Sequence, residues 1–422
     1  MLAEFRVSNY RSFKDEQVLS LIATSEESKG TNSVEVGGYN ILKSAVVYGA
    51  NASGKSNLIK AMACMNDIVS NSAGYKPDQS LPIIPFAFDK KTKKQPSTFE
   101  VTFFMDSIRY QYGFSATSKQ ITREWLLSWP KKRSQTWFER DVEEGEPYFG
   151  PSLKGQNKAI WGKVKDNSLF LSTAAQWDHE LLSKVYKWFE EEFRELPPRK
   201  SGTQVTDQLF FSMKNIEERA EYYNLAMELL KSADFGIDDI DIKKIDVDKL
   251  DFPEGMPEGT RKAIIKNLSK LPRYSKSFSH CNGKYSLSIE EESDGTQRFY
   301  ALLGPLVTSL VFGFTIFEDE LELNMHPLLT RKLIESIREL EFDVGCAQLI
   351  FTTHDTTLLD PELFGRDQVW FTEKDKQGAT QLYSLADYKD VRKGEPMQKK
   401  YLAGRYGAIP ILERFDLSGA KK

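Results

Sequence analysis

The stretch SAVVYGANASGKS constrains the fold of this 422-residue chain more than any other part of it. Residues 44–48 are a short, apolar, β-branched run typical of a buried central strand. Residues 49–56 match the pattern G-x-x-x-x-G-K-[ST] at every fixed position, and apolar residues then recur at helical spacing over residues 57–72. Strand, glycine-rich loop and helix in this order predict a phosphate-binding loop in an α/β fold.

The residues of this loop point to a nucleoside triphosphate bound with Mg²⁺. Glycines let the backbone curl so that its N–H groups face phosphate oxygens, and the following helix presents its positive N-terminus there. Lys55 supplies a charge for the β- and γ-phosphates, and the Ser56 hydroxyl is a ligand for Mg²⁺. The nucleotide-binding residues predicted in this segment are Asn51, Ala52, Ser53, Gly54, Lys55, Ser56 and Asn57.

A phosphate-binding loop needs an acidic partner at the end of a neighbouring strand, and two segments offer one. Residues 101–106 end at Asp106, but no second acid is adjacent and the segment alternates like a surface hairpin. Residues 315–320 (TIFEDE) form an apolar strand that ends in paired carboxylates, and we favour this segment. Asp319 would hold the metal, and Glu320 would act as the general base for the attacking water.

Two further polar positions complete the predicted site. Residues 348–355 (QLIFTTHD) read as a buried strand ending in His354, which could reach the γ-phosphate and sense hydrolysis. Ser293 and Gly295 precede a helix, where they would form a second anion site, with a plain helix cap as the alternative. They lie just over twenty residues before Asp319, the order found when a second subunit's phosphate is bound from the opposite side.

Together these motifs resemble those of the ABC-type ATPases of the SMC, Rad50 and RecF class, in which two heads sandwich two ATP molecules. GANASGKS matches the Walker A loop, SDGTQ resembles the signature motif, TIFEDE the Walker B strand, LELNMHP the D-loop and TTHD the switch histidine. The resemblance implies ATP and Mg²⁺ as cofactors, ATP hydrolysis as the activity, and an ATP-dependent head-to-tail dimer or a higher homo-oligomer.

The same resemblance assigns further residues to the nucleotide. Arg11 and Ser12 in NYRSF would contact it, and Gln176, at the end of a strand predicted over residues 168–176, would meet the metal. The sequence departs from the class at Glu292 and Asp294, where Leu and Gly are usual. It also lacks sustained heptads between the two halves, which argues against SMC or Rad50 proper.

A closer resemblance is to small bacterial AAA ATPases with ABC-like heads in anti-phage systems. These are the RloA-like and abortive-infection AbiL-type proteins, related to the ATPases of the PARIS and Septu systems. The stretches FRVSNYRSFKDEQVLSLIA, LKSAVVYGANASGKS, FGPSLKG, SLFLSTAAQ, HPLLTRKLI and YLAGRYGAIP carry the resemblance. It implies a sensor and scaffold that works with a separately encoded effector protein, typically a Toprim-type nuclease. The chain shows no Toprim pattern of its own.

Two other functions remain open at this point. A RecF-like or OLD-like DNA-repair ATPase would bind DNA directly through basic segments such as residues 90–94, 131–133 and 261–276. A non-catalytic, nucleotide-dependent interaction module is the other alternative, and the paired Asp319 and Glu320 argue against it.

Composition limits the partners and the compartment. With 57 Lys and Arg against 61 Asp and Glu, the net charge of −4 does not suggest nucleic-acid binding by bulk charge. Three widely spaced cysteines support neither a disulfide framework nor a zinc site, and the N-terminus has no apolar leader core. We expect a cytoplasmic protein.

One long uncharged stretch requires an explanation. Residues 299–317 carry no charge, which approaches the length of a membrane-spanning helix. Gly304, Pro305 and Gly313 instead favour a buried helix followed by a buried strand, so we expect no membrane partner.

The predicted fold class is α/β: an ABC-ATPase head with a mixed sheet and a P-loop, split by a largely helical insertion. We expect the N-terminal half of the head with an antiparallel β subdomain over residues 1–177. A mostly helical insertion, serving as a lid or a partner-binding element, would follow over residues 178–288. The C-terminal half, with signature, Walker B strand and switch histidine, would span residues 289–422.

Overall fold

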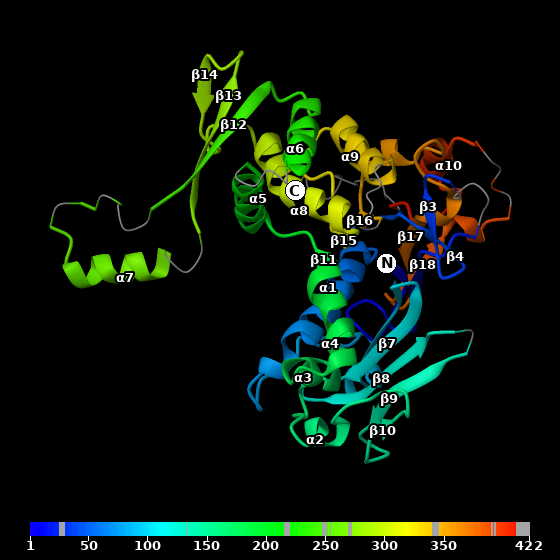
Figure 1. Cartoon of the computed structure of the whole chain (residues 1–422). Coiled ribbons are helices and arrows are strands. Elements are labelled where there is room, and N and C mark those ends of the chain that lie inside the picture. The colour runs from blue at the N-terminus through cyan, green and yellow to red at the C-terminus, as the bar shows by residue number, and fades with distance from the viewer. Residues whose placement is uncertain are drawn as a thin grey trace, which may run out of the picture.

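The computed structural model describes residues 1–24, 30–131, 133–214, 220–246, 250, 252–253, 255–268, 272–339, 346–389, 391 and 394–410. Two large sheets face each other across one helix, α1 (Lys55–Asn71) (Figure 1). The predicted α/β class with a mixed sheet and a P-loop is confirmed.

The first sheet has six strands in the order β11-β15-β16-β5-β17-β18. All neighbouring pairs are parallel except β17 with β18. The central strands are buried at every residue, as expected where a parallel sheet is covered on both faces. The strands are β11 (Phe193–Glu195), β15 (Thr315–Glu318), β16 (Gln348–Thr352), β5 (Ser44–Gly49), β17 (Val369–Lys374) and β18 (Thr380–Ser384).

The second sheet has seven antiparallel strands in the order β10-β9-β8-β7-β6-β1-β2. Its longer strands alternate buried with partly exposed side chains over much of their length, the pattern of a sheet with one face on the core. The strands are β1 (Leu2–Ser8), β2 (Gln17–Ser20), β6 (Ser97–Met105), β7 (Ile108–Ala116), β8 (Ile121–Trp129), β9 (Gln135–Asp141) and β10 (Tyr148–Phe149). A separate hairpin joins β3 (Ser33–Val36) to β4 (Tyr39–Leu42).

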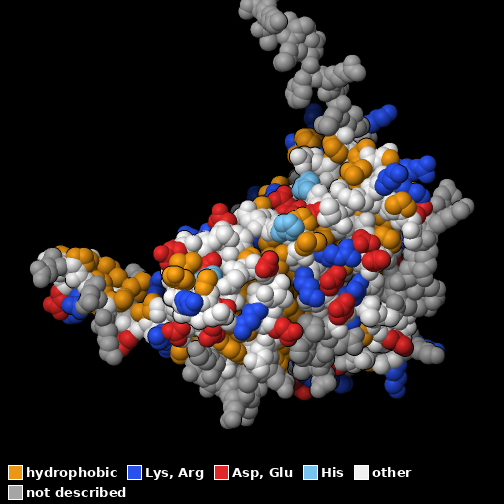
Figure 2. All heavy atoms as spheres, turned by 90° about the horizontal axis from the view of Figure 1, so that it is seen from above, with side chains coloured by type: hydrophobic (Ala, Val, Ile, Leu, Met, Phe, Trp, Pro, Cys, Tyr) orange, Lys and Arg blue, Asp and Glu red, His pale blue; other side chains and the backbone are white. Residues whose placement is uncertain are grey.

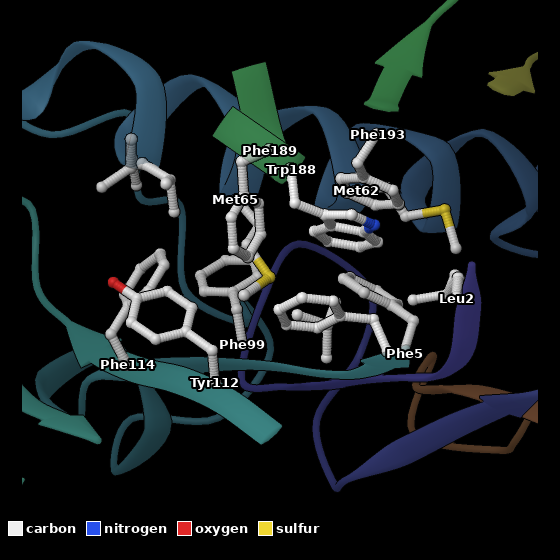
Figure 3. Packing of buried hydrophobic residues seen from close by; sticks show 14 of the residues in the cluster. Leu2, Phe5, Met62, Met65, Phe99, Tyr112, Phe114, Trp188, Phe189 and Phe193 are labelled. Atoms are coloured by element: carbon white, nitrogen blue, oxygen red, sulfur yellow. The ribbon is translucent and has the colours of Figure 1, made fainter. Parts of the chain in front are cut away.

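The core between the sheets is built on α1 and a cluster of aromatic rings. Met62 and Met65 of α1 lie in one apolar cluster with side chains of the antiparallel sheet (Figure 3). Trp188 stacks on Phe103 with ring centroids 4.0 Å apart. Because burial of large apolar side chains is the dominant favourable term in folding, this cluster fixes α1, and therefore the P-loop at its start, against both sheets.

The insertion contributes helices and a small sheet. Its helices are α4 (Glu180–Lys187), α5 (Arg199–Lys214), α6 (Ala220–Ser232) and α7 (Glu258–Leu268), and its three-stranded sheet comprises β12 (Ile237–Lys244), β13 (Tyr274–His280) and β14 (Tyr285–Leu287). The small sheet and α7 project from the body of the molecule (Figure 1). Helices α5 and α6 lie within the range expected for the insertion. Strand β11 also lies within the range expected for the insertion, yet it pairs with β15 of the core sheet.

The remaining helices lie in both halves of the chain. They are α2 (Asn157–Trp161), α3 (Phe170–Gln176), α8 (Asp294–Phe312), α9 (Pro327–Glu339) and α10 (Met397–Leu402). The uncharged stretch forms the buried helix α8 followed by the buried strand β15, as predicted. Among the described residues, no helix combines the length and the apolar character that crossing a membrane requires.

The strand predicted over residues 168–176 is wrong, because most of this segment forms helix α3. The fully buried carboxylate of Glu124 accepts hydrogen bonds from the backbone N–H groups of Phe170 (2.7 Å) and Leu171 (3.0 Å). Free N–H groups in the first turn are what a helix must satisfy, so this distant side chain caps α3. A short apolar run alone does not distinguish a buried helix from a buried strand.

Candidate nucleotide-binding site

The P-loop begins at the carboxyl end of β5 and leads directly into α1. Gly54 adopts φ 122°, a conformation that disfavours any side chain, and a Cβ there would collide with Thr380. Ala52 is left-handed at φ 62°. The loop is therefore held in a tight curl between α1 and the neighbouring strand β18.

Lys55 is the cation of this loop. Its ammonium donates to the carbonyl oxygens of Gly49 (2.8 Å) and Ala50 (3.2 Å), which keeps it inside the curl. Burial lowers the pKa of Lys55, and the charges of Asp319, Glu320 and Glu322 oppose this shift. The lysine and the acidic cluster predicted from the sequence therefore face one another, although they lie in opposite halves of the chain.

Thr352 at the end of β16 is hydrogen-bonded to both acidic residues. Its hydroxyl donates to Asp319 Oδ1 (2.7 Å) and accepts from the backbone N–H of Glu320 (2.9 Å). Strand β16 lies between β15 and β5, so the threonine stands between the acids and the P-loop. This one hydroxyl sets the position of both acidic residues.

His354 lies beside the predicted general base. Its Nε2 is 3.9 Å from Glu320 Oε1, and its backbone N–H donates to Glu322 Oε1 (2.7 Å). The carboxyl ends of β15 and β16 thus bring Asp319, Glu320 and His354 to one edge of the sheet.

Glu318, the first acid of the cluster, has a different environment. It is buried and forms an ion pair with Arg298 of α8. Burial raises the pKa of Glu318 to about 7, against the opposing effect of the Arg298 charge. This carboxylate ties α8 to the edge of β15, whereas Asp319, Glu320 and Glu322 are the acids whose charges act on Lys55.

The N-terminal segment reaches the same region through Ser12. The Ser12 hydroxyl accepts from Asn57 Nδ2 (2.7 Å) and is hydrogen-bonded to Thr380 Oγ1 (2.8 Å). Arg11 is left-handed at φ 50°, and its guanidinium lies 5.6 Å from the centre of the Tyr10 ring. Ser12 therefore stands close to the start of α1, whereas Arg11 lies beside the Tyr10 ring.

Two threonines of the C-terminal strands support the loop and were missed by the sequence analysis. Thr372 bonds the Ser53 hydroxyl (2.7 Å), and Thr380 donates to the Ser53 carbonyl oxygen (2.8 Å). Both lie in ordinary strand sequence, where no spacing distinguishes a supporting hydroxyl from any other buried threonine.

The structure does not bring Gln176 to the acidic cluster. The Ser172 hydroxyl of the same helix donates to the Val69 carbonyl oxygen (2.6 Å), near the end of α1 opposite to the P-loop. At about 1.5 Å per residue, Val69 lies roughly 20 Å along α1 from Lys55, and Gln176 is one further turn beyond Ser172.

Strand β11, which pairs with β15, ends at Glu195. The sequence analysis missed this residue. The backbone N–H of Leu196 donates to the Phe317 carbonyl oxygen (3.0 Å), which extends the pairing to the edge of the sheet. Burial, together with the charge of Asp319, raises the pKa of Glu195. A strand of three residues carries too short a pattern to be found in the sequence.

Ser293 and Gly295 lie at the start of α8. The Ser293 hydroxyl accepts from the backbone N–H of Thr296 (3.1 Å), and Asp294 forms an ion pair with Arg199 (2.9 Å). In the described part of the chain, no hydrogen bond or ion pair joins this helix start to the P-loop. Within one chain, the start of α8 and the P-loop are therefore two separate candidate phosphate-binding elements.

The donors at this site suit a magnesium nucleotide. A serine hydroxyl at the start of α1 and the carboxylate of Asp319 are hard oxygen ligands of the kind that Mg²⁺ prefers. The buried ammonium of Lys55 and the helix start favour phosphate oxygens.

Comparison with known proteins gives a family match and distant structural similarity. The profile of a family described as "AAA domain, putative AbiEii toxin, Type IV TA system" matches residues 44–360, which include the P-loop, the acidic cluster and His354. No curated protein matches the chain.

Three solved structures of SMC heads are similar to 91% of this chain. The SMC head domain from Thermotoga maritima is 11% identical, with a TM-score of 0.41 over 98% of that chain. An SMC head bound to the C-winged helix domain of ScpA is 12% identical, with a TM-score of 0.38 over 97% of that chain. An Smc head with an extended coiled coil, bound to the C-terminal domain of ScpA derived from Pyrococcus furiosus, is 13% identical, with a TM-score of 0.37 over 96% of that chain.

Proposed function

Because this chain belongs to the family described as "AAA domain, putative AbiEii toxin, Type IV TA system", we propose that it binds ATP with Mg²⁺ and hydrolyses the γ-phosphate. The observation that carries the proposal is the hydrogen bonding of Thr352 to Asp319 and to the backbone of Glu320, at a site that also contains Lys55.

Each residue of the site has a distinct role in this proposal. The P-loop N–H groups and Lys55 bind the β- and γ-phosphates, and Ser56 with Asp319 would hold Mg²⁺. When bound, Mg²⁺ neutralises charge on the phosphate oxygens. Glu320 takes a proton from the attacking water, and His354 beside it senses the γ-phosphate.

We further propose that two copies close head to tail around ATP. Ser293 and Gly295 at the start of the 19-residue helix α8 would bind the γ-phosphate of the nucleotide held by the second copy. The proposal is supported by the separation of this helix start from the P-loop of its own chain.

In the cell, we propose that the ATPase is the sensor and scaffold of an anti-phage system with a separately encoded effector, a Toprim-type nuclease. The family description, which includes a toxin–antitoxin system, and the sequence resemblance to RloA-like and AbiL-type ATPases support this role. Residues 178–288 would supply the lid or the partner-binding surface. Deleting the neighbouring effector gene should abolish protection and leave the ATPase intact, whereas protection by this chain alone would contradict the proposal.

Nucleotide binding to the purified chain tests the core of the proposal. The Lys55→Ala variant should bind ATP at least about tenfold more weakly, because a charge-assisted bond to phosphate is worth roughly 1.5–3 kcal/mol. Lys184→Ala, which removes an exposed lysine of α4, is the matched control and should bind like the wild type. Equal affinities for the wild type and Lys55→Ala would contradict the assignment of this loop.

A further inference from the structure

A second pocket lies at the edge of the core opposite to the P-loop. It has a volume of about 390 Å³ and is lined by Gly37, Tyr39, Phe104, Ser107, Arg109, Trp129, Pro130 and Lys131. Phe104 donates its backbone N–H to the carbonyl oxygen of Met1, and the next residue, Leu2, is bonded to Gln348 at the amino end of β16. The P-loop follows the carboxyl end of β5, which runs parallel to β16, so the two sites are at opposite edges of the sheet.

This pocket, which we call the aromatic–cationic pocket, combines flat apolar surfaces with positive charge. Among the residues that the structure describes, its lining includes three aromatic rings, two cations and no carboxylate. The Arg109 guanidinium stacks on Trp129 at 4.3 Å from the ring centre, and the rings of Tyr39 and Phe104 lie 5.6 Å apart. Such surfaces bind planar, anionic ligands through stacking and charge.

The guanidinium of Arg109 has N–H donors that lack an acceptor in the described chain. Among the described residues it forms no ion pair, and its one hydrogen bond, from Nη1 to the Tyr39 hydroxyl, is long at 3.5 Å. Its Nε is buried without an acceptor. A buried donor without a partner is costly in a folded protein, so a ligand with an acceptor oxygen in the pocket would relieve this cost.

A comparison with an arginine of the neighbouring strand β8 shows that Arg109 of β7 is unusual. Arg123 also lies over a tryptophan of β8, at 5.7 Å from the ring centre of Trp125. Arg123, however, is paired with Glu139 (3.2 Å) and Asp141 (2.9 Å), which neutralise it. The charge of Arg109 has no such carboxylate partner in the described chain.

The sequence beside the pocket extends its positive charge. Lys131 is followed by Lys132 and Arg133, so three basic residues are consecutive where β8 ends. A ligand with a single phosphate would bind only to Arg109 and Lys131, the two cations of the pocket lining. Consecutive basic residues in the sequence suit a ligand with several phosphates in a row.

We infer that the aromatic–cationic pocket binds single-stranded nucleic acid, with one nucleotide seated in it. The base stacks beside Trp129 and Tyr39, its phosphate is bound by Arg109 and Lys131, and Arg133 supplies a further cation for a neighbouring phosphate. This inference is independent of the proposed ATPase, because none of these residues belongs to the P-loop site.

Fluorescence anisotropy with a labelled single-stranded oligonucleotide tests the inference, with the full-length chain in a Lys55→Ala background so that the P-loop does not contribute. Arg109→Ala and Trp129→Ala should each weaken binding about fivefold or more, since base stacking is worth roughly 1–3 kcal/mol. Lys131→Ala should lower the salt dependence of binding by about one unit of the logarithmic slope. Arg123→Ala is the control and should bind like the parent.

Several results would overturn the inference. These are the absence of oligonucleotide binding at low salt, or equal losses in Arg109→Ala and Arg123→Ala. A free mononucleotide that competes as well as the strand would show that the pocket takes one nucleotide and not a strand. If Trp129→Ala fails to fold, Arg109→Lys decides the matter: it keeps the charge but loses the planar stacking group, and it should still bind more weakly than the parent.

Discussion

Thr352 positions the chemistry of the proposed site without being part of it. It carries no charge, and the TTHD pattern that contains it singles out only the histidine, yet its hydroxyl bonds both Asp319 and the backbone of Glu320. A fully buried hydroxyl with two such bonds restricts where both carboxylates can lie.

The first prediction concerns this hydroxyl. Thr352→Val keeps the shape of the side chain but removes both hydrogen bonds, so the acids lose their support. We expect turnover to fall about tenfold, with little change in the dissociation constant for ATP. Single-turnover hydrolysis and equilibrium binding measure the two quantities. Thr352→Ser, which retains the hydroxyl, should recover most of the loss, and equal turnover in the Val variant and the wild type would refute the positioning role.

The second prediction concerns Asp294, the acid that departs from the signature pattern. At the start of α8 it stabilises the helix, but it would repel the phosphate of a second subunit. Its ion pair with Arg199 offsets this charge. Arg199→Ala should therefore weaken ATP-dependent dimerisation by a few-fold, the scale of an exposed ion pair, and adding Asp294→Asn should restore it. Dimer dissociation constants measured by mass photometry check this, and a double variant no better than Arg199→Ala would exclude the mechanism.

The residues that could be predicted from the sequence are those with fixed spacing. Lys55 and Asp319 belong to local patterns in which glycines, charges and an apolar strand occur at set positions. Thr352, Thr380 and Glu195 could not be predicted, because each acts through a contact between segments distant in the chain.

At the scale of elements, helix α3 shows where pattern analysis fails. Its apolar residues fit a buried strand equally well, and the distant carboxylate of Glu124 decides in favour of the helix by capping the first turn. Strand β11 escaped prediction for the opposite reason: it has only three residues, and it is defined by pairing with β15. Strands β5 and β15 and helix α1 could be predicted because each contains a continuous or periodic run of apolar residues, and those residues are buried.

The third prediction is a pH effect at the start of α4. His179 Nδ1 accepts from the backbone N–H of Leu182 (3.2 Å), while Nε2 is bonded to Asn157 Oδ1 (2.9 Å), so the ring is neutral. Burial lowers the pKa of His179 below its ordinary 6.5. The unfolded chain therefore binds this proton more readily, and the free energy of unfolding should decrease as the pH falls below about 6.5.

Denaturant unfolding at pH 7.5 and pH 5.5 (both about one unit from the ordinary histidine pKa) measures this effect. His179→Asn keeps a side chain that caps helices but does not titrate, so its stability should change less between the two conditions. An identical pH dependence in the variant and the wild type would contradict the role of His179.

At the scale of the whole molecule, the proposed site depends on strand pairing between distant parts of the chain. Strand β5, which leads into the P-loop, lies between β16 and β17 from the C-terminal region. The acidic cluster, His354 and the supporting threonines therefore reach the P-loop only when the complete core sheet has formed. The distribution of surface charge does not single out a binding face in this view. Basic and acidic side chains are interspersed on the face seen in Figure 2, in keeping with the net charge of −4.

The central claim is that this composite site hydrolyses ATP with Glu320 as the base. The most direct test is phosphate release by the purified wild type and by Glu320→Gln, measured together with ATP binding to both. We predict that the wild type releases phosphate in the presence of Mg²⁺, and that Glu320→Gln binds ATP normally but turns over roughly 10²–10⁴-fold more slowly. Phosphate release by Glu320→Gln at the wild-type rate, or none by the wild type under conditions where it binds ATP, would contradict the account.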